Sequence, residues 1–128
     1  MALTDSLRGY WKLNASGLLV DATGLNPNLT NNNVVTNVAG KVGEAAQFTA
    51  ASSQSLSVAN SANLQTGDID FTIACWCYFD SVATIESLVN KWQAGPGYEF
   101  TLSFGPTNIV FYVTHDNATA VAVSSAPF

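Results

Sequence analysis

The residues best suited to ligand chemistry gather in one glycine-rich stretch, Lys91-Trp-Gln-Ala-Gly-Pro-Gly-Tyr98. Sugar binding uses an exposed aromatic ring to stack on a pyranose, and Trp and Tyr combine a large apolar body with a polar tip. Trp92 is the leading candidate for that ring, with Tyr98 and Asn90 near it in the sequence. These three residues predict a ligand-binding site; the alternative is that Trp92 covers the edge of the core.

Catalytic chemistry is harder to place. Glycoside hydrolysis needs two carboxyl groups on either side of the scissile bond. The glutamates Glu44, Glu86 and Glu99 lie far apart in the sequence, and the nearest carboxylate pair is Asp68 and Asp70. That pair lies at the start of a predicted strand, where a role in a turn or in strand capping is the better explanation. We therefore predict no catalytic residues and no enzymatic activity.

The histidine and the two cysteines offer little chemistry. His115 is the single histidine, so a Ser-His-Asp set would depend on it alone, and its surroundings indicate an exposed hairpin turn. Cys75 and Cys77 lie two residues apart in an apolar run, which points both to one side of a strand. A disulfide between them would distort the strand. A metal or redox role lacks further ligands nearby, so the spacing favours two small buried side chains.

Composition excludes whole classes of partner. Of the 128 residues 48% are apolar and only 10% are charged, and the net charge is −5. The basic residues Arg8, Lys12, Lys41 and Lys91 are scattered, so no basic stripe for nucleic acid or for an anionic membrane can form. The exposed surface must instead consist largely of Ser, Thr, Asn, Gln and Ala, which suits sugar contact, extracellular display or packing among neighbours.

The termini bear on location. No apolar run reaches the roughly 18 residues of a membrane-spanning helix, which predicts no membrane insertion. The start, Met1-Ala-Leu-Thr-Asp-Ser-Leu, lacks the basic-then-apolar pattern of a secretory signal. We expect an extracellular location or the surface of a virion or other particle, reached after removal of a signal or by another route, such as release inside an assembled particle.

The elements that must position these residues are strands. No segment shows a helical period, and short β-rich runs alternate with Asn, Gly, Ser, Asp and Pro clusters. The run from Asp70 to Phe79 is apolar on both sides, which predicts a central strand covered on both faces. Regular short spacing predicts a sandwich or barrel in one domain covering 1–128. The predicted strands are residues 7–13, 34–36, 45–48, 55–58, 70–79, 85–91, 98–104, 108–114 and 118–123.

Several motifs carry a family resemblance. Gly40-Lys-Val-Gly-Glu-Ala-Ala-Gln-Phe48 is similar to a Gly-x-x-Gly-x-Ala-x-x-Phe signature, and Asp70-Phe-Thr-Ile-Ala-Cys-Trp76 to a Phe-Thr-Ile-x-x-Trp strand. Together with Gly9-Tyr-Trp-Lys-Leu-Asn14 and Asp21-Ala-Thr-Gly24, they resemble the laminin-G-like jelly-roll family of the concanavalin A-like lectin and glucanase superfamily. The resemblance implies an all-β, antiparallel two-sheet jelly-roll sandwich, in which Phe48 and Trp76 fill the space between the sheets.

The same resemblance suggests a metal. Sandwiches of this kind often hold Ca²⁺ at loop carboxylates and carbonyls, and calcium takes six to eight oxygen ligands. The position carried over is Asp21, with Asn26 in support; the alternative is that Asp21 forms an Asx-turn. Family members that hydrolyse glycans carry two glutamates about four residues apart, and this sequence has no such pair.

The resemblance also raises the question of the sheet edge. The family continues with an aromatic–His strand and further returning strands, whereas this sequence stops at Phe128. An open edge invites pairing. We expect either the N-terminal part of a longer domain or a short variant completed by self-assembly or by a neighbouring chain.

Three functions remain to be compared. The first is a non-catalytic binding module that recognises glycan or a protein surface. The second is a structural or decorating component of a viral or extracellular assembly, which the low charge and missing signal favour. The third, a glycoside hydrolase, is opposed by the number and spacing of the carboxylates.

Overall fold

The computed structural model describes residues 6–67, 69–91, 99–114 and 120–127. Within them the chain is an all-β protein, because every paired strand is antiparallel and the helical elements are short 3-10 turns. None of the helices in these ranges has the length and apolar character needed to cross a membrane. The chain divides into two compact units, Met1–Gln65 and Thr66–Phe128, which are described separately.

The first unit contains two small antiparallel pairs of strands. β1 (Thr30–Asn32) pairs with β4 (Ser55–Ser57), and β2 (Thr36–Ala39) pairs with β3 (Glu44–Gln47). The 3-10 turns η2 (Ala50–Ser52) and η3 (Ala62–Leu64) flank β4 in the sequence. Polar side chains support these short strands: Asn32 Nδ2 donates to Ser55 Oγ at 3.2 Å and to Ser57 Oγ at 3.1 Å across the β1–β4 pair.

The β2–β3 hairpin has the glycine turn that the sequence predicts. Gly40 N donates to Gly43 O at 2.8 Å, and Gly43 has φ of 67°, a conformation that a side chain would strain. A Cβ on Gly40 would lie 3.0 Å from the Cβ of Ala45, so the turn also requires two small residues to meet. The signature motif therefore specifies a tight turn in this chain.

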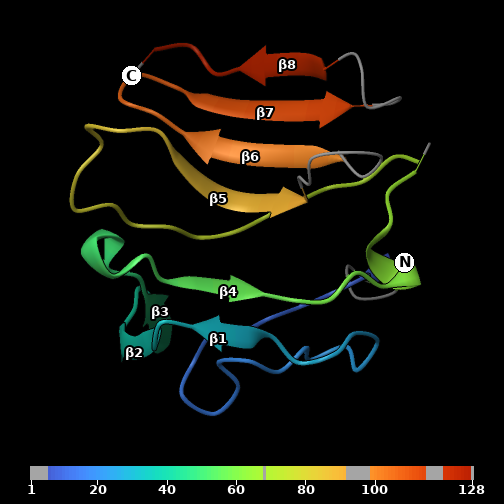
Figure 1. The fold of residues 1–128 in the computed structure, drawn as a ribbon, viewed down its shortest axis with the longest axis vertical. Coiled ribbons are helices and arrows are strands. Elements are labelled where there is room, and N and C mark those ends of the chain that lie inside the picture. The colour runs from blue at the N-terminus through green and yellow to red at the C-terminus, as the bar shows by residue number, and fades with distance from the viewer. Residues whose placement is uncertain (1–5, 68, 92–98, 115–119, 128) are drawn as a thin grey trace. The chain divides into compact units, whose positions relative to one another are not determined.

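The second unit is a four-stranded antiparallel sheet (Figure 1). Its strands β5 (Glu86–Lys91), β6 (Phe100–Phe104), β7 (Ile109–Thr114) and β8 (Ala120–Ser124) follow each other in sequence and in space. Alternation separates the two faces: Phe100, Leu102 and Phe104 of β6 lie on one side, Thr101 and Ser103 on the other. We call the side of the sheet that carries Phe100, Leu102 and Phe104 the apolar face. The side that carries Thr101 and Ser103 is the polar face, which also holds Val110, the register partner of Ser103.

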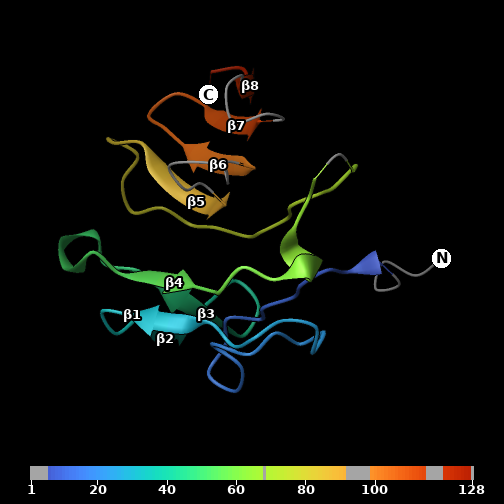
Figure 2. The same ribbon diagram turned by 45° about the vertical axis from the view of Figure 1, so that its right-hand side comes forward.

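The segment 71–79 covers part of the apolar face. The ring of Phe71 lies 5.3 Å from that of Phe100 and 5.9 Å from that of Phe111, centroid to centroid. The ring of Phe79 stacks on Phe104 at 4.0 Å with an interplanar angle of 10°. In Figures 1 and 2 the coil that precedes β5 runs alongside that strand. The aromatic contacts at its two ends hold this segment on the sheet.

The predicted strands from residue 85 onward, and those at 45–48 and 55–58, are confirmed within about two residues. Two further predictions differ from the structure, one in kind and one in its bounds. Residues 7–13 contribute only a single bridge, between Trp11 and Asp21. The predicted strand 34–36 begins later, at Thr36, because Val34 has φ of 61°, which is incompatible with a strand.

The prediction that 70–79 is a central strand covered on both faces is also wrong. The segment pairs with no other strand in the described part of the chain, and its even-numbered side chains from 72 to 78 are exposed. Trp76 is 97% exposed, Cys75 and Cys77 are exposed rather than buried, and Phe48 is half exposed. Phe48 and Trp76 are therefore not buried side chains within their own units.

Candidate polar binding site on the four-stranded sheet

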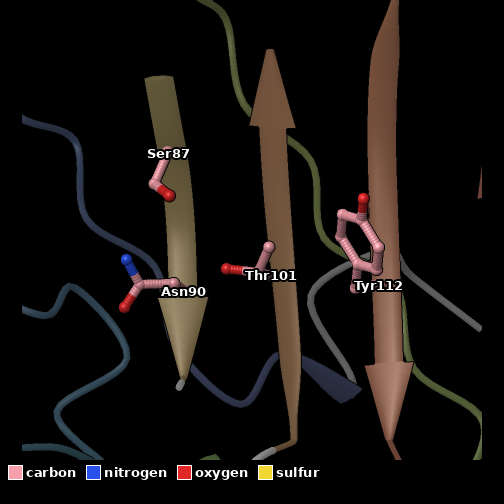
Figure 3. A pocket seen from close by; sticks show the side chains of 4 residues that line it. All are labelled: Ser87, Asn90, Thr101 and Tyr112. Carbon is pink, nitrogen blue, oxygen red and sulfur yellow. The ribbon is translucent and has the colours of Figure 1, made fainter. Parts of the chain in front are cut away.

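A row of polar side chains crosses the polar face of the sheet. Asn90 on β5 is the register partner of Thr101 on β6, and Thr101 is the partner of Tyr112 on β7. Directly opposed residues of antiparallel strands share a face, with Cβ atoms about 5 Å apart. Figure 3 shows these three side chains and Ser87 on three neighbouring strands, where they line a depression of about 370 Å³.

A β-bulge places Ser87 and Asn90 on the same face. Ser87 pairs with Ser103, and the register then shifts so that Val89 pairs with Leu102 and Asn90 with Thr101. Without the extra residue, Leu88, positions 87 and 90 would point to opposite sides because strand side chains alternate. The bulge thus brings the two β5 side chains into one site.

The lining groups make neutral hydrogen bonds and offer one aromatic ring. An Asn amide has donors and an acceptor, and each hydroxyl of Ser, Thr and Tyr can do both. Asn90 is exposed and Tyr112 is 36% exposed, so both side chains are accessible to a ligand. Among the described residues, no acid, histidine or lysine lines the depression. The described lining groups suit hydrogen bonding to a neutral polyhydroxyl surface.

The structure places only one of the three sequence-predicted binding residues. Asn90 lies in the site, whereas Trp92 and Tyr98 fall outside the described residues. Ser87, Thr101 and Tyr112 were missed by the sequence reasoning. The alternation of Thr101 and Ser103 with the phenylalanines of the same strand was a signal for a polar face, but the bulge that aligns Ser87 left no such signal.

The predicted metal residue Asp21 lies in a dense hydrogen-bond network. The residue is 4% exposed. Its Oδ1 accepts from Tyr10 N at 2.9 Å and from Thr23 N at 3.0 Å. Its Oδ2 accepts from Thr23 Oγ1 at 2.6 Å, from Asn26 N at 3.0 Å and from Asn26 Nδ2 at 2.9 Å. Burial raises the Asp21 pKa, but the hydrogen bonds outweigh it and hold the pKa well below its usual range.

These contacts do not fit a calcium ion. Calcium requires oxygen lone pairs directed at it, whereas Asp21 is surrounded by the hydrogens of N–H and O–H donors. The Asn26 amide is also committed: its Nδ2 donates to Arg8 O at 2.7 Å, and its Oδ1 accepts from Ser61 Oγ at 2.8 Å. No group of three or more metal-ligating side chains occurs among the described residues. The bond from Thr23 N gives Asp21 the Asx-turn role that the sequence left as the alternative.

The glutamates have separate structural contacts. Glu44 accepts from Ala15 N at 2.9 Å, and Glu86 accepts from Thr84 Oγ1 at 2.8 Å. Glu99 forms an ion pair with Lys91 and accepts from Thr66 N and Thr66 Oγ1, each at 2.7 Å. Burial raises the Glu99 pKa, and the bonds from Lys91 and Thr66 lower it further than burial raises it.

The remaining catalytic candidates do not form a site in the described ranges. Asp70 is exposed, while its sequence neighbour Asp68 and the single histidine, His115, lie outside the described residues.

No family model, curated protein or solved structure matches the chain.

Proposed function

We propose that the chain is a non-catalytic binding module whose polar sheet face contacts carbohydrate. The observation that carries the proposal is the cross-strand row Asn90–Thr101–Tyr112. A neutral amide, two hydroxyls and a ring edge or face match the alternating hydroxyl and apolar surfaces of a sugar. Trp92 and Tyr98 lie between β5 and β6 in the sequence, and they stay predicted sugar-contacting residues.

The composition of the site supports glycan over a protein surface. Protein interfaces are rich in large apolar side chains and arginine at their centre. Among the described lining residues the one large side chain is Tyr112, and none is charged. We further propose that the fold is a two-sheet jelly roll of the laminin-G-like type and that the protein acts outside the cell or on a particle surface.

A second function is a structural or decorating component of a viral or extracellular assembly. The observation that favours it is the exposure of Trp76 and Tyr78 on the segment that precedes β5. The two functions are compatible if an assembled particle displays the sugar-binding face.

The test of the binding module is a glycan array followed by calorimetric titration of the best ligand with the full chain. Asn90→Ala and Tyr112→Ala should each weaken binding by about tenfold or more, because each removes a hydrogen-bonding group or a ring from the contact. Thr107→Ala, at an exposed position outside the lining, is the matched control and should bind normally. Full affinity in both site variants would refute the assignment to this face.

A further inference from the structure

The segment from Phe71 to Phe79 has the amino-acid composition of a β-strand, but in the described structure it pairs with no other strand. Its even-numbered side is uncovered: Trp76 is 97% exposed and Tyr78 is 88% exposed. Its backbone makes no hydrogen bond to a neighbouring strand in the described part of the chain. Apolar side chains next to unpaired N–H and C=O groups are the features of an exposed strand edge, which pairs readily with another chain.

The segment is nevertheless held in place. Phe71 contacts Phe100 and Phe111, and Phe79 stacks on Phe104, so both ends are fixed on the apolar face of the sheet. A partner strand would therefore add to a segment that is already ordered by the sheet beneath it. Pre-ordering of this kind lowers the entropy lost on association.

We propose that two copies of this chain associate by antiparallel pairing of their Phe71–Phe79 segments about a two-fold axis at Cys75. Side-chain size differs across that residue in a way that suits a two-fold contact: the even-numbered residues before Cys75 are small and those after it are large. With Cys75 at the centre, Ala74 of one copy faces Trp76 of the other, and Thr72 faces Tyr78. Each large exposed ring thus meets a small side chain, and the two-fold axis repeats the contact.

The exposed area is adequate for a modest dimer. A Trp or Tyr side chain buries about 150–250 Å² when it is covered. The two rings therefore supply roughly half of the ~800 Å² per partner of a standard interface. Ile69, which is more than half exposed and lies two residues before Phe71, can add to the contact.

Charged residues at the ends of the segment should make dimerisation depend on salt concentration. In this register Asp70 of one copy faces Asp80 of the other, and like charges directly opposed are unfavourable. Both carboxylates are exposed, so added salt screens their repulsion. Dimerisation should strengthen between low and physiological ionic strength, the reverse of an interface built on opposite charges.

The first test is sedimentation velocity of the full chain over a range of concentrations. We expect a monomer–dimer equilibrium that Trp76→Ala weakens by tenfold or more and that Ala74→Pro abolishes by removing a ladder N–H. Val42→Ala, at an exposed apolar position on the β2–β3 turn, is the matched control. A monomer at every concentration, or a dimer unchanged in both variants, would overturn the proposal.

The second test reads the register in the unmodified chain, so it does not depend on how well a variant folds. Diamide accepts two electrons and two protons from a pair of thiols, and Cys75 of the two copies would be directly opposed. Burial and the neighbouring Cys77 raise the pKa of the Cys75 thiol, so the oxidation is run above pH 8. A covalent dimer should form in Cys77→Ser and not in Cys75→Ser; the opposite pattern contradicts the register.

Hydrogen exchange identifies the occupant. Pairing between copies predicts slower exchange of the 72–78 amides as protein concentration rises. If the protein is a monomer and these amides exchange slowly at every concentration, another segment of the same chain pairs with residues 72–78. That result would refute the dimer.

Discussion

The side-chain amide of Asn26 joins three separate parts of the first unit. Its nitrogen donates to Asp21 Oδ2 at 2.9 Å and to Arg8 O at 2.7 Å, and its oxygen accepts from Ser61 Oγ at 2.8 Å. With the other donors to Asp21, this amide connects the N-terminal stretch, the Asp-x-x-Gly loop and the residues before η3. A motif that the family resemblance associated with calcium is here a hydrogen-bonded structural centre.

Replacing Asp21 should therefore destabilise the chain without involving calcium. Asp21→Ala leaves several buried donors without an acceptor, and we expect a loss of about 3 kcal/mol in the free energy of unfolding. Urea unfolding measures it, with Asp80→Ala as the exposed-acid control. Adding millimolar calcium should leave the unfolding midpoint of the unmodified chain unchanged; a clear increase would restore the metal-site interpretation.

Stability should fall in acid, and Asp21 should account for part of the fall. Its pKa is lowered in the folded state from an ordinary value of 3.8, so the unfolded state takes up the proton first. The stabilisation is complete above about pH 5 and is lost as pH falls below the unfolded-state value. Glu99, with its pKa also lowered, acts with the same sign. Unfolding midpoints between pH 7 and 3 should decline less steeply in Asp21→Ala than in the unmodified chain.

Gly9 should not tolerate a side chain. A Cβ there would lie 2.7 Å from two ring atoms of Trp11 and 3.2 Å from Asn26 Nδ2, so Gly9→Ala must displace the indole or the amide. We expect a loss of about 1–3 kcal/mol. Gly17→Ala is the control, because its nearest neighbour is Asn14 Oδ1 at 3.4 Å, an ordinary contact. Equal thermal midpoints for the two variants would contradict the packing described for Trp11.

The β5 bulge can be tested by deletion. Removing Leu88 restores regular alternation, so either Ser87 or Asn90 must leave the polar face. Glycan affinity should drop by about tenfold, as for loss of a single hydrogen-bonding side chain. Leu88→Ala keeps the bulge and should retain affinity. If the deletion variant folds, as judged by circular dichroism, and binds normally, the site does not depend on the bulge.

Phe79 should contribute more to stability than Phe48. Phe79→Ala removes a ring stacked on Phe104 at 4.0 Å and releases one end of the segment before β5. We expect a cost of about 2 kcal/mol, below the usual range for a fully buried Phe because the residue is only half-buried. Phe48→Ala, at a half-exposed position, should cost less. Chemical denaturation of both variants distinguishes them.

Local sequence chemistry was enough to predict much of the second unit. Turn-forming residues separate β5 to β8, and the β2–β3 turn follows from Gly40 and Gly43, where backbone geometry demands glycine. Strand β1 was missed because an Asn-rich run normally indicates a loop; Asn32 instead bonds the side chains of the opposing strand. Such cross-strand partners are distant in sequence and leave no local pattern.

The Asp70–Phe79 run shows the opposite error. Its alternating apolar side chains have high β-propensity, but propensity reports how well a residue fits a sheet and not whether a neighbouring strand exists. The prediction of the site was limited in a similar way. Asn90 could be predicted from its residue type, whereas Ser87 and Tyr112 lie in the site because of how the strands are aligned with one another. Register depends on one inserted residue, Leu88, that looks ordinary in the sequence.

The contacts between Lys91 and Glu99 affect how this surface can evolve. Glu99 N donates to Lys91 O at 3.0 Å, and their side chains form an ion pair, so the chain positions on either side of residues 92–98 are already joined. Closing a longer connection between two fixed points costs only about 0.6 kcal/mol for each doubling of its length. Insertions and exchanges within 93–97 should therefore leave the pairing of β5 with β6 intact, which makes this stretch of sequence a suitable place to graft new segments.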